Sequence, residues 1–127
     1  MGRAWGRLPE RTDFLRVAAQ GIRQGTPAFL LQAAFRSPDM PGSLRVGFTA
    51  SRKIGNAVAR NRAKRRLRAA ADSALSAMMN QTIDLVLVAR HSAATRDFAA
   101  MTSEMRNAAE RVLHQLTQTK PKAATPS

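Results

Sequence analysis

Residues 51–70 read SRKIGNAVARNRAKRRLRAA, and nine of them, Arg60 to Arg68, carry six cationic side chains and no acidic one. Small and apolar residues recur at helical spacing through this stretch and beyond it. They are Ala59, Ala63, Leu67, Ala70, Ala74 and Met78, and on a helix they form one stripe about 100° wide. We therefore predict a helix over roughly residues 56–79, entered through Gly55 and capped by Asn56 or Ser51, which packs through its stripe and presents cations elsewhere.

The charge on this helix is not that of an ordinary surface. Three like-charged pairs stand four residues apart: Arg60 and Lys64, Lys64 and Arg68, and Arg62 and Arg66. Each pair costs a few tenths of a kcal/mol on an isolated helix. The stretch between Asp39 and Asp72 has no carboxylate and supplies nine of the 21 Lys and Arg residues of a chain with net charge +13. A polyanion, above all a phosphate backbone, is the expected partner, and a merely solvated helix face is the alternative.

The segments on either side of the basic helix read as strands. AFLLQAAF at 28–35 and LRVGFTA at 44–50 alternate in character, and the turn residues SPDMPG at 37–42 separate them. This pattern predicts an antiparallel pair with one buried and one polar face. IDLVLVA at 83–89 is almost continuously apolar, which predicts a strand covered on both faces and parallel to the strand that precedes the helix.

Two further helices complete the expected fold. Thr12 and Asp13 predict the start of a first helix that ends between Gly21 and Gly25, and apolar spacing predicts a last helix over about 102–118. We expect residues 1–11 to be a flexible lead-in and residues 119–127 to be a disordered tail. The prediction is one domain over residues 1–118, an α/β (α+β) two-layer sandwich with a small mixed sheet and the order α-β-β-α-β-α.

The composition argues against catalysis by this chain alone. Only His91 and His114 are present, the eight carboxylates are scattered, there is no cysteine, and no glycine-rich loop matches a phosphate-binding pattern. We therefore assign no catalytic and no metal-binding residue. No apolar run approaches the roughly 20 residues that cross a bilayer, and the missing cysteines fit a reducing compartment, so we expect a cytoplasmic protein without membrane contact.

Asn61 lies between two arginines, where its amide could read a base edge or sugar hydroxyl or could cap local backbone. Arginine forms bidentate phosphate contacts that lysine cannot form, which favours docking to a folded nucleic acid. Charge alone does not decide between DNA and RNA.

At this point the sequence resembles a known family. Residues 51–70 closely resemble the signature of the bacterial ribonuclease P protein subunit, and weaker similarity extends over about residues 8–117. The matching positions are Ser51, Lys53, Gly55, Asn56, Ala57, Arg60, Asn61, Arg62, Lys64, Arg65 and Arg68.

The resemblance implies both a fold and a function. It implies an α/β sandwich with a left-handed crossover around the basic helix, where the general rule favours a right-handed one. It also implies that the chain binds a catalytic RNA and the 5′ leader of precursor tRNA, so that the ribonucleoprotein removes the leader by endonucleolytic cleavage. The catalytic Mg²⁺ would be held mainly by the partner RNA, and no obligate protein partner is expected.

Two sets of site residues follow. The catalytic RNA would be contacted by the basic helix, through Arg60, Asn61, Arg62, Lys64, Arg65, Arg66 and Arg68. The leader would lie in a cleft formed by Phe14, Leu30, Gln32, Thr49, Ser51, Arg52, Lys53 and Arg90. A solvent face is the alternative for Gln32 and Thr49, and helix–sheet core is the alternative for Phe14.

The sequence departs from the family pattern at three positions. Ala63 stands where a branched aliphatic is usual, and Ala18 and Gln32 stand where many members have an aromatic residue. We therefore expect leader binding that depends less on stacking and more on charge. Two alternative functions are a structural RNA-binding protein, such as a ribosomal protein, and a stand-alone nuclease.

Overall fold

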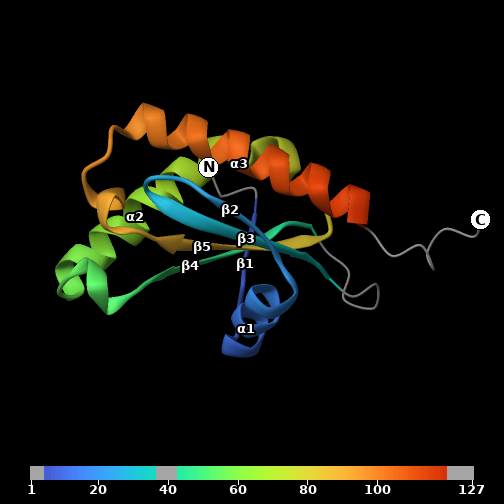
Figure 1. Cartoon of the computed structure of the whole chain (residues 1–127), viewed down its shortest axis with the longest axis horizontal. Helices are drawn as coiled ribbons and strands as arrows, with labels where there is room; N and C mark the ends of the chain where they lie inside the picture. Colours follow the sequence, from blue (N-terminus) through green and yellow to red (C-terminus); the bar gives the residue numbers. More distant parts are fainter. Residues whose placement is uncertain (1–4, 37–42, 120–127) are drawn as a thin grey trace, which may run out of the picture.

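A computed structural model of the chain describes residues 5–36 and 43–119 and contains one mixed sheet of five strands (Figure 1). The strands lie in the order β1-β4-β5-β3-β2. Their bounds are β1 Gly6–Arg7, β2 Ile22–Gly25, β3 Phe29–Phe35, β4 Arg45–Ala50 and β5 Ile83–Ala89. The prediction of a small mixed sheet with helices is confirmed.

Within the described residues, three α-helices cover the two faces of this sheet, and three short 3₁₀ helices connect the elements. The α-helices are α1 Arg11–Gln20, α2 Ala57–Ala74 and α3 Phe98–Thr119; the 3₁₀ helices are η1 Arg52–Ile54, η2 Ser76–Met78 and η3 His91–Ala94. In Figure 1, α2 and α3 lie on one side of the sheet and α1 lies on the other. No helix among the residues described has the length and apolar character needed to cross a bilayer.

The central strand is β5, and this position corrects the expected pairing. β3 and β4 do not pair with each other, because β5 lies between them, antiparallel to β3 and parallel to β4. Leu87 of β5 is the register partner of both Leu31 and Phe48. The strand most apolar on both faces therefore occupies the place that is covered from both sides, as its sequence predicted. The parallel arrangement of β5 with its predecessor is confirmed.

Alternate residues of the strands serve two separate cores. The larger core lies under α2 and α3 and includes Phe29, Leu31, Val46 and Leu85, all at most 1% exposed. The smaller core lies under α1 and combines Leu8, Val17, Ala34 and Val86, with Phe14 and Val88 at its edge. The face that was expected to be polar is therefore half covered by α1.

The lead-in predicted over residues 1–11 is wrong for its described part. Gly6–Arg7 pairs in parallel with Arg45–Val46 of β4, and the side chains of Trp5 and Leu8 are 5% and 2% exposed. Burial of these two apolar side chains holds the segment against the sheet edge. Residues 1–4 lie outside the described residues, as does the predicted tail from residue 120 onward.

Helix and strand boundaries near the N-terminus also differ from expectation. α1 begins at Arg11, one residue before the predicted cap Thr12, and Glu10 is the residue at its N-cap, while Asp13 lies in the first turn as predicted. The segment between Gly21 and Gly25 forms β2, which pairs antiparallel with β3, rather than a helix end. α3 begins at Phe98, four positions earlier than predicted.

Candidate RNA-binding surface

The start of the basic helix is fixed by two local features that the sequence indicated. Gly55 has φ +141°, a conformation that side-chain-bearing residues rarely adopt. The Asn56 side chain then accepts a hydrogen bond from the Ala59 amide at 2.9 Å, so Asn56 rather than Ser51 caps α2. These two residues turn the chain sharply from η1 into α2.

The predicted apolar stripe is the side of α2 that packs, and it packs on the sheet and on α3. Of the stripe, Ala63, Leu67, Ala70, Ala74 and Met78 are buried and Ala59 is half-buried, and Ala71 is buried beside them. Because most of these side chains are single methyl groups, the helix backbone lies close to its neighbours and the longer cationic side chains radiate from the other faces. No salt bridge of the residues described here involves a cation of α2.

One side of α2 uses its arginines to hold the protein together. Arg66 donates through Nη1 to the carbonyl oxygen of Ala93 and through Nη2 to that of Arg96, both at 2.7 Å, and its guanidinium lies 5.9 Å from the ring centre of Phe98. Arg62 donates through Nε to the Ala94 carbonyl oxygen at 3.2 Å. Both arginines were predicted to contact RNA, and here both bind the backbone of η3 and the turn that follows it.

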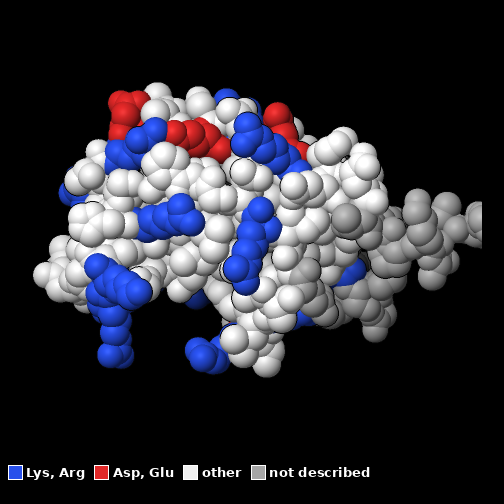
Figure 2. Space-filling view, viewed as in Figure 1, with Lys and Arg blue, Asp and Glu red and all other residues white. Residues whose placement is uncertain are grey.

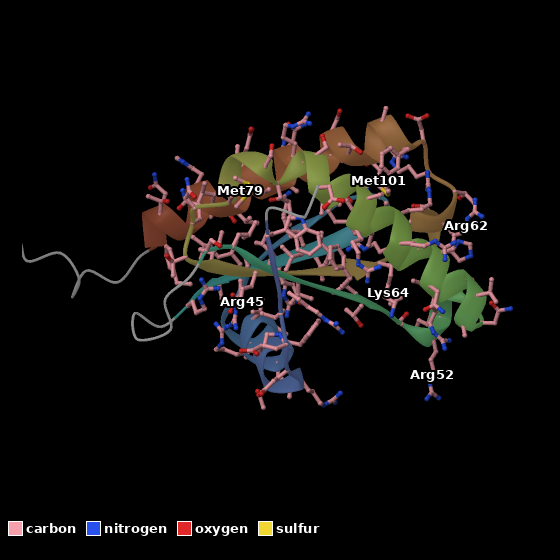
Figure 3. The ribbon with its side chains drawn as sticks, turned by 180° about the vertical axis from the view of Figure 1, so that it is seen from behind. Arg45, Arg52, Arg62, Lys64, Met79 and Met101 are labelled. Carbon is pink, nitrogen blue, oxygen red and sulfur yellow. The ribbon has the colours of Figure 1, made fainter. Side chains whose placement is uncertain are left out.

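The opposite side of α2 faces a groove. Figure 3 shows Arg62 on the side of α2 toward η3 and Lys64 on the side toward β4 and β1. Lys64 and Arg68 line the groove, and the Arg68 guanidinium lies 5.3 Å from the ring centre of Phe48. The family resemblance assigned all the cations of the helix to one RNA-binding set, whereas the fold divides them by the direction in which they leave the helix.

A third group of side chains points into solvent. Asn61 and Arg65 are exposed on α2, and Ser51, Arg52 and Lys53 are exposed at η1. Arg52 projects away from the body of the fold (Figure 3). The remaining cation, Arg60, donates to the Gly55 carbonyl oxygen at 2.8 Å and so lies back over the helix entry.

The groove itself has a volume of about 800 Å³ and runs between α1, β4, β1 and α2. Phe14, Gln32 and Thr49 of the predicted leader cleft line it together. A Cβ atom at Gly47 would lie only 2.4 Å from Phe14 Cζ, so glycine at this position allows the Phe14 ring to rest directly on the sheet. Phe14 is thus partly in the smaller core and partly on the groove surface, which joins the two alternatives that its sequence position left open.

Leu30 and Arg90, also predicted to lie in the cleft, are not among the residues that line the groove. Leu30 is half-buried opposite Val88 in the sheet. Arg90 donates from Nη1 to the Thr26 carbonyl oxygen at 2.8 Å and so binds the turn between β2 and β3. Ser51, Arg52 and Lys53 also lie outside the groove lining, at the end of β4.

The surface around these elements is strongly positive. Figure 2 shows Lys and Arg without Asp or Glu over the lower part of one face, while the acidic side chains in that view gather near the top, over α3. One acidic side chain does not reach the surface, because Asp84 is fully buried and paired with arginines. Among the described residues, the cations of α2 form no salt bridge with a carboxylate, so their charge is available to a phosphate.

Sequence reasoning missed two features of this region. One is β1, where Arg7 and the flanking residues Trp5 and Leu8 line the groove. The other is the buried charge cluster of Asp84. Its signal was the single charged residue in each of two strands, Arg45 in β4 and Asp84 in β5, which carry opposite charge and become register partners.

Comparison with known proteins finds relatives over most of the chain. The family model for ribonuclease P matches residues 4–113. The chain is 47% identical over 102 residues to the ribonuclease P protein component of Ruegeria pomeroyi, covering 80% of this chain and 81% of that protein. It is 43% identical over 108 residues to the ribonuclease P protein component of Paramagnetospirillum magneticum, covering 84% and 81%.

Solved structures agree at the level of the fold. The Staphylococcus aureus ribonuclease P protein superposes with a TM-score of 0.63 at 27% identity, covering 86% of this chain and 93% of that one. The Thermotoga maritima ribonuclease P protein superposes with a TM-score of 0.69 at 24% identity, covering 84% and 96%. The family match over most of the chain and the curated relatives together show that this chain belongs to the ribonuclease P protein family.

Proposed function

We propose that the chain acts as the protein subunit of a ribonuclease P ribonucleoprotein, binding a catalytic RNA and the 5′ leader of precursor tRNA. The observation that carries the proposal is the basic helix α2, which presents exposed cations without carboxylate partners directly beside a groove. One face of α2 is exposed and can contact one RNA, and another face borders the groove, which can hold a second. This arrangement suits a protein that binds two RNA molecules at once.

The catalytic RNA is assigned to the exposed end of the helix. Asn61 and Arg65 on α2, with Arg52 and Lys53 on η1, are exposed and make no carboxylate contact within the described ranges. Arg52 and Lys53 lie at the turn between β4 and α2, and Asn61 and Arg65 follow on the exposed side of the first half of α2. The leader is assigned to the groove, where Phe14, Gln32 and Thr49 can meet unpaired bases.

The chain's own residues do not suit a magnesium site. Among the residues described, no three His, Asp or Glu side chains converge as a metal site would require. Asp84 is already bound by arginines, and Glu104 accepts two hydrogen bonds from Arg96. We therefore place the catalytic Mg²⁺ mainly on the partner RNA and assign bond cleavage to that RNA, with the protein binding and orienting the substrate.

Reconstitution tests this function. The purified, RNA-free chain should not cleave precursor tRNA, and adding a ribonuclease P catalytic RNA at low Mg²⁺ should give cleavage faster than that RNA alone. Cleavage by the RNA-free chain would favour the stand-alone nuclease. No acceleration, together with another RNA recovered on the chain from cells, would favour a structural RNA-binding protein.

The assignment to the exposed corner can be tested separately. Arg65→Gln should weaken assembly with the catalytic RNA, whereas Arg106→Gln, which removes the same charge from the exposed face of α3, should not. Equal effects of the two variants would show that only overall charge matters and would contradict the assigned surface.

A further inference from the structure

The groove has a second basic wall, formed by the N-terminal segment. Trp5 is 5% exposed and its ring centre lies 5.4 Å from that of Phe48. The Gly6 amide donates to the Leu44 carbonyl oxygen at 2.8 Å, and the Leu8 amide donates to that of Val46 at 3.1 Å. These contacts hold the backbone on both sides of Arg7, so an exposed arginine is presented from an anchored strand.

Four cationic side chains line the groove from its two sides. Arg7 of β1 and Arg11 of α1 come from the N-terminal segment, and Lys64 and Arg68 come from α2. Among the described residues that line the groove, the one carboxylate is Glu10, whose Oε1 accepts from the Thr12 hydroxyl at 3.5 Å. None of the four cations forms a salt bridge with the residues that the structure describes. The lining therefore carries a net charge of +3, four cations against one carboxylate, over a floor that is polar and aromatic.

This distribution of charge suits one kind of ligand. Cations on both walls can reach phosphates, while Phe14, Gln32 and Thr49 on the floor can reach base faces and edges. Bases become available to such a floor only when they are unpaired and unstacked, so a single strand fits and a duplex does not.

We propose that Arg7 and Arg11 bind backbone phosphates of the same single-stranded RNA segment that Lys64 and Arg68 contact. The N-terminal segment then forms a working wall of the leader groove, and Lys64 and Arg68 serve the leader rather than the catalytic RNA. This inference rests on the proposed function, because the single strand in question is the precursor leader.

The test compares Arg7→Gln with Arg106→Gln in the full chain assembled with a ribonuclease P catalytic RNA. Affinity is measured for precursor tRNA with its leader and for mature tRNA without one. Arg7→Gln should weaken precursor binding about fivefold at about 0.1 M salt. One phosphate contact to a single strand contributes a slope of about 0.7 to log affinity against log salt, so a tenfold drop from 1 M salt strengthens that contact about fivefold. Arg7→Gln should reduce that slope by about 0.7 and leave mature tRNA binding unchanged. Arg106→Gln should change neither affinity.

A second variant protects the test against misfolding. Arg11→Gln, at the exposed first residue of α1, should reproduce the effect of Arg7→Gln, and the double variant should weaken precursor binding by roughly 25-fold, the product of two fivefold losses. Thermal unfolding of each variant checks that the fold is kept.

The outcomes separate this proposal from the function on which it rests. Unchanged precursor affinity in both variants would overturn the proposal. Equal losses of affinity for precursor and mature tRNA, or weaker assembly with the catalytic RNA, would also overturn it, because Arg7 would then contact something other than the leader. A wild-type chain that fails to assemble, or that does not favour precursor over mature tRNA, would instead contradict the proposed function itself.

Discussion

Arg45 on β4 and Asp84 on β5 are register partners that form a two-pronged ion pair in the interior of the sheet. Nε of Arg45 donates to Oδ1 of Asp84 at 2.9 Å and Nη2 donates to Oδ2 at 2.7 Å. Arg36 adds a bond to Oδ1 at 2.7 Å, and Arg16 of α1 also reaches Oδ2. One buried carboxylate thus joins β3, β4, β5 and α1, and it fixes the position of α1 over the sheet and therefore the shape of the groove.

Replacing this carboxylate should be costly. Asp84→Asn should lower the free energy of unfolding by about 3 kcal/mol or more, because the guanidinium groups of Arg36 and Arg45 lose a buried, charged hydrogen-bond acceptor. Urea unfolding followed by circular dichroism measures the change. Asp72→Asn, which removes an exposed carboxylate from α2, should stay within about 0.5 kcal/mol of the wild type. Similar values for the two variants would show that the cluster does not stabilise the fold.

The same cluster predicts an acid-dependent loss of stability. Burial raises the pKa of Asp84, but the hydrogen bonds and charges of Arg45 and Arg36 outweigh it, so the pKa lies below its ordinary value of 3.8. The resulting stabilisation is complete above the unfolded-state pKa and is lost as the pH falls through the lower folded-state pKa. The stability difference between wild type and Asp84→Asn should therefore be constant above about pH 5 and shrink below pH 3.8. A difference that does not vary with pH would contradict the assigned pKa.

Arg65 and Arg66 are neighbours in the sequence, but replacing one should affect RNA binding and replacing the other should affect stability. Arg66→Gln should lower the free energy of unfolding by about 1–3 kcal/mol, because two backbone carbonyl groups lose a charged donor. Arg65→Gln should leave stability within about 0.5 kcal/mol and weaken binding to the catalytic RNA, with a salt slope smaller by about 1. Denaturation curves and salt titrations of both variants provide the comparison. The division of α2 into two functional sides would be wrong if the variants lost stability equally.

Phe14 should matter more to the fold than to the leader. Its ring rests on Gly47, so much of its surface is already used in packing, and the groove offers four cations as an alternative source of affinity. Phe14→Ala should reduce stability by about 2 kcal/mol, yet weaken precursor binding less than about tenfold. Affinity is measured where unfolding curves show the variant to be folded. A larger loss would show that base stacking on Phe14 dominates leader binding.

The local structure followed closely from the sequence. The apolar stripe of α2, the bend at Gly55 and a cap at Asn56 or Ser51 all concern residues within a few positions of one another, where spacing and side-chain type decide the outcome. The apolar run at 83–89 likewise predicted a strand covered on both faces. The surface charge of α2 followed from the same local pattern.

The order of the strands in the sheet did not follow from the sequence. The pattern of β3 and β4 indicated a hairpin, yet β5 separates them, because strand order depends on which faces can be covered together and not on adjacency in the chain. β1 was missed because two residues give no readable alternation, and its register comes from Trp5 packing against Phe48.

The sequence by itself determined that this chain would carry a dense row of cations on one helix laid on a mixed sheet, since helical spacing fixes which residues share a face. Only the tertiary structure decided what each cation does. Arg62 and Arg66 donate hydrogen bonds to carbonyl groups of η3 and the turn after it. Lys64 and Arg68 line the groove, and Arg65 is exposed to solvent. The physical reason is that neighbouring positions on a helix point about 100° apart, so side chains of the same type meet different partners brought there by distant parts of the chain.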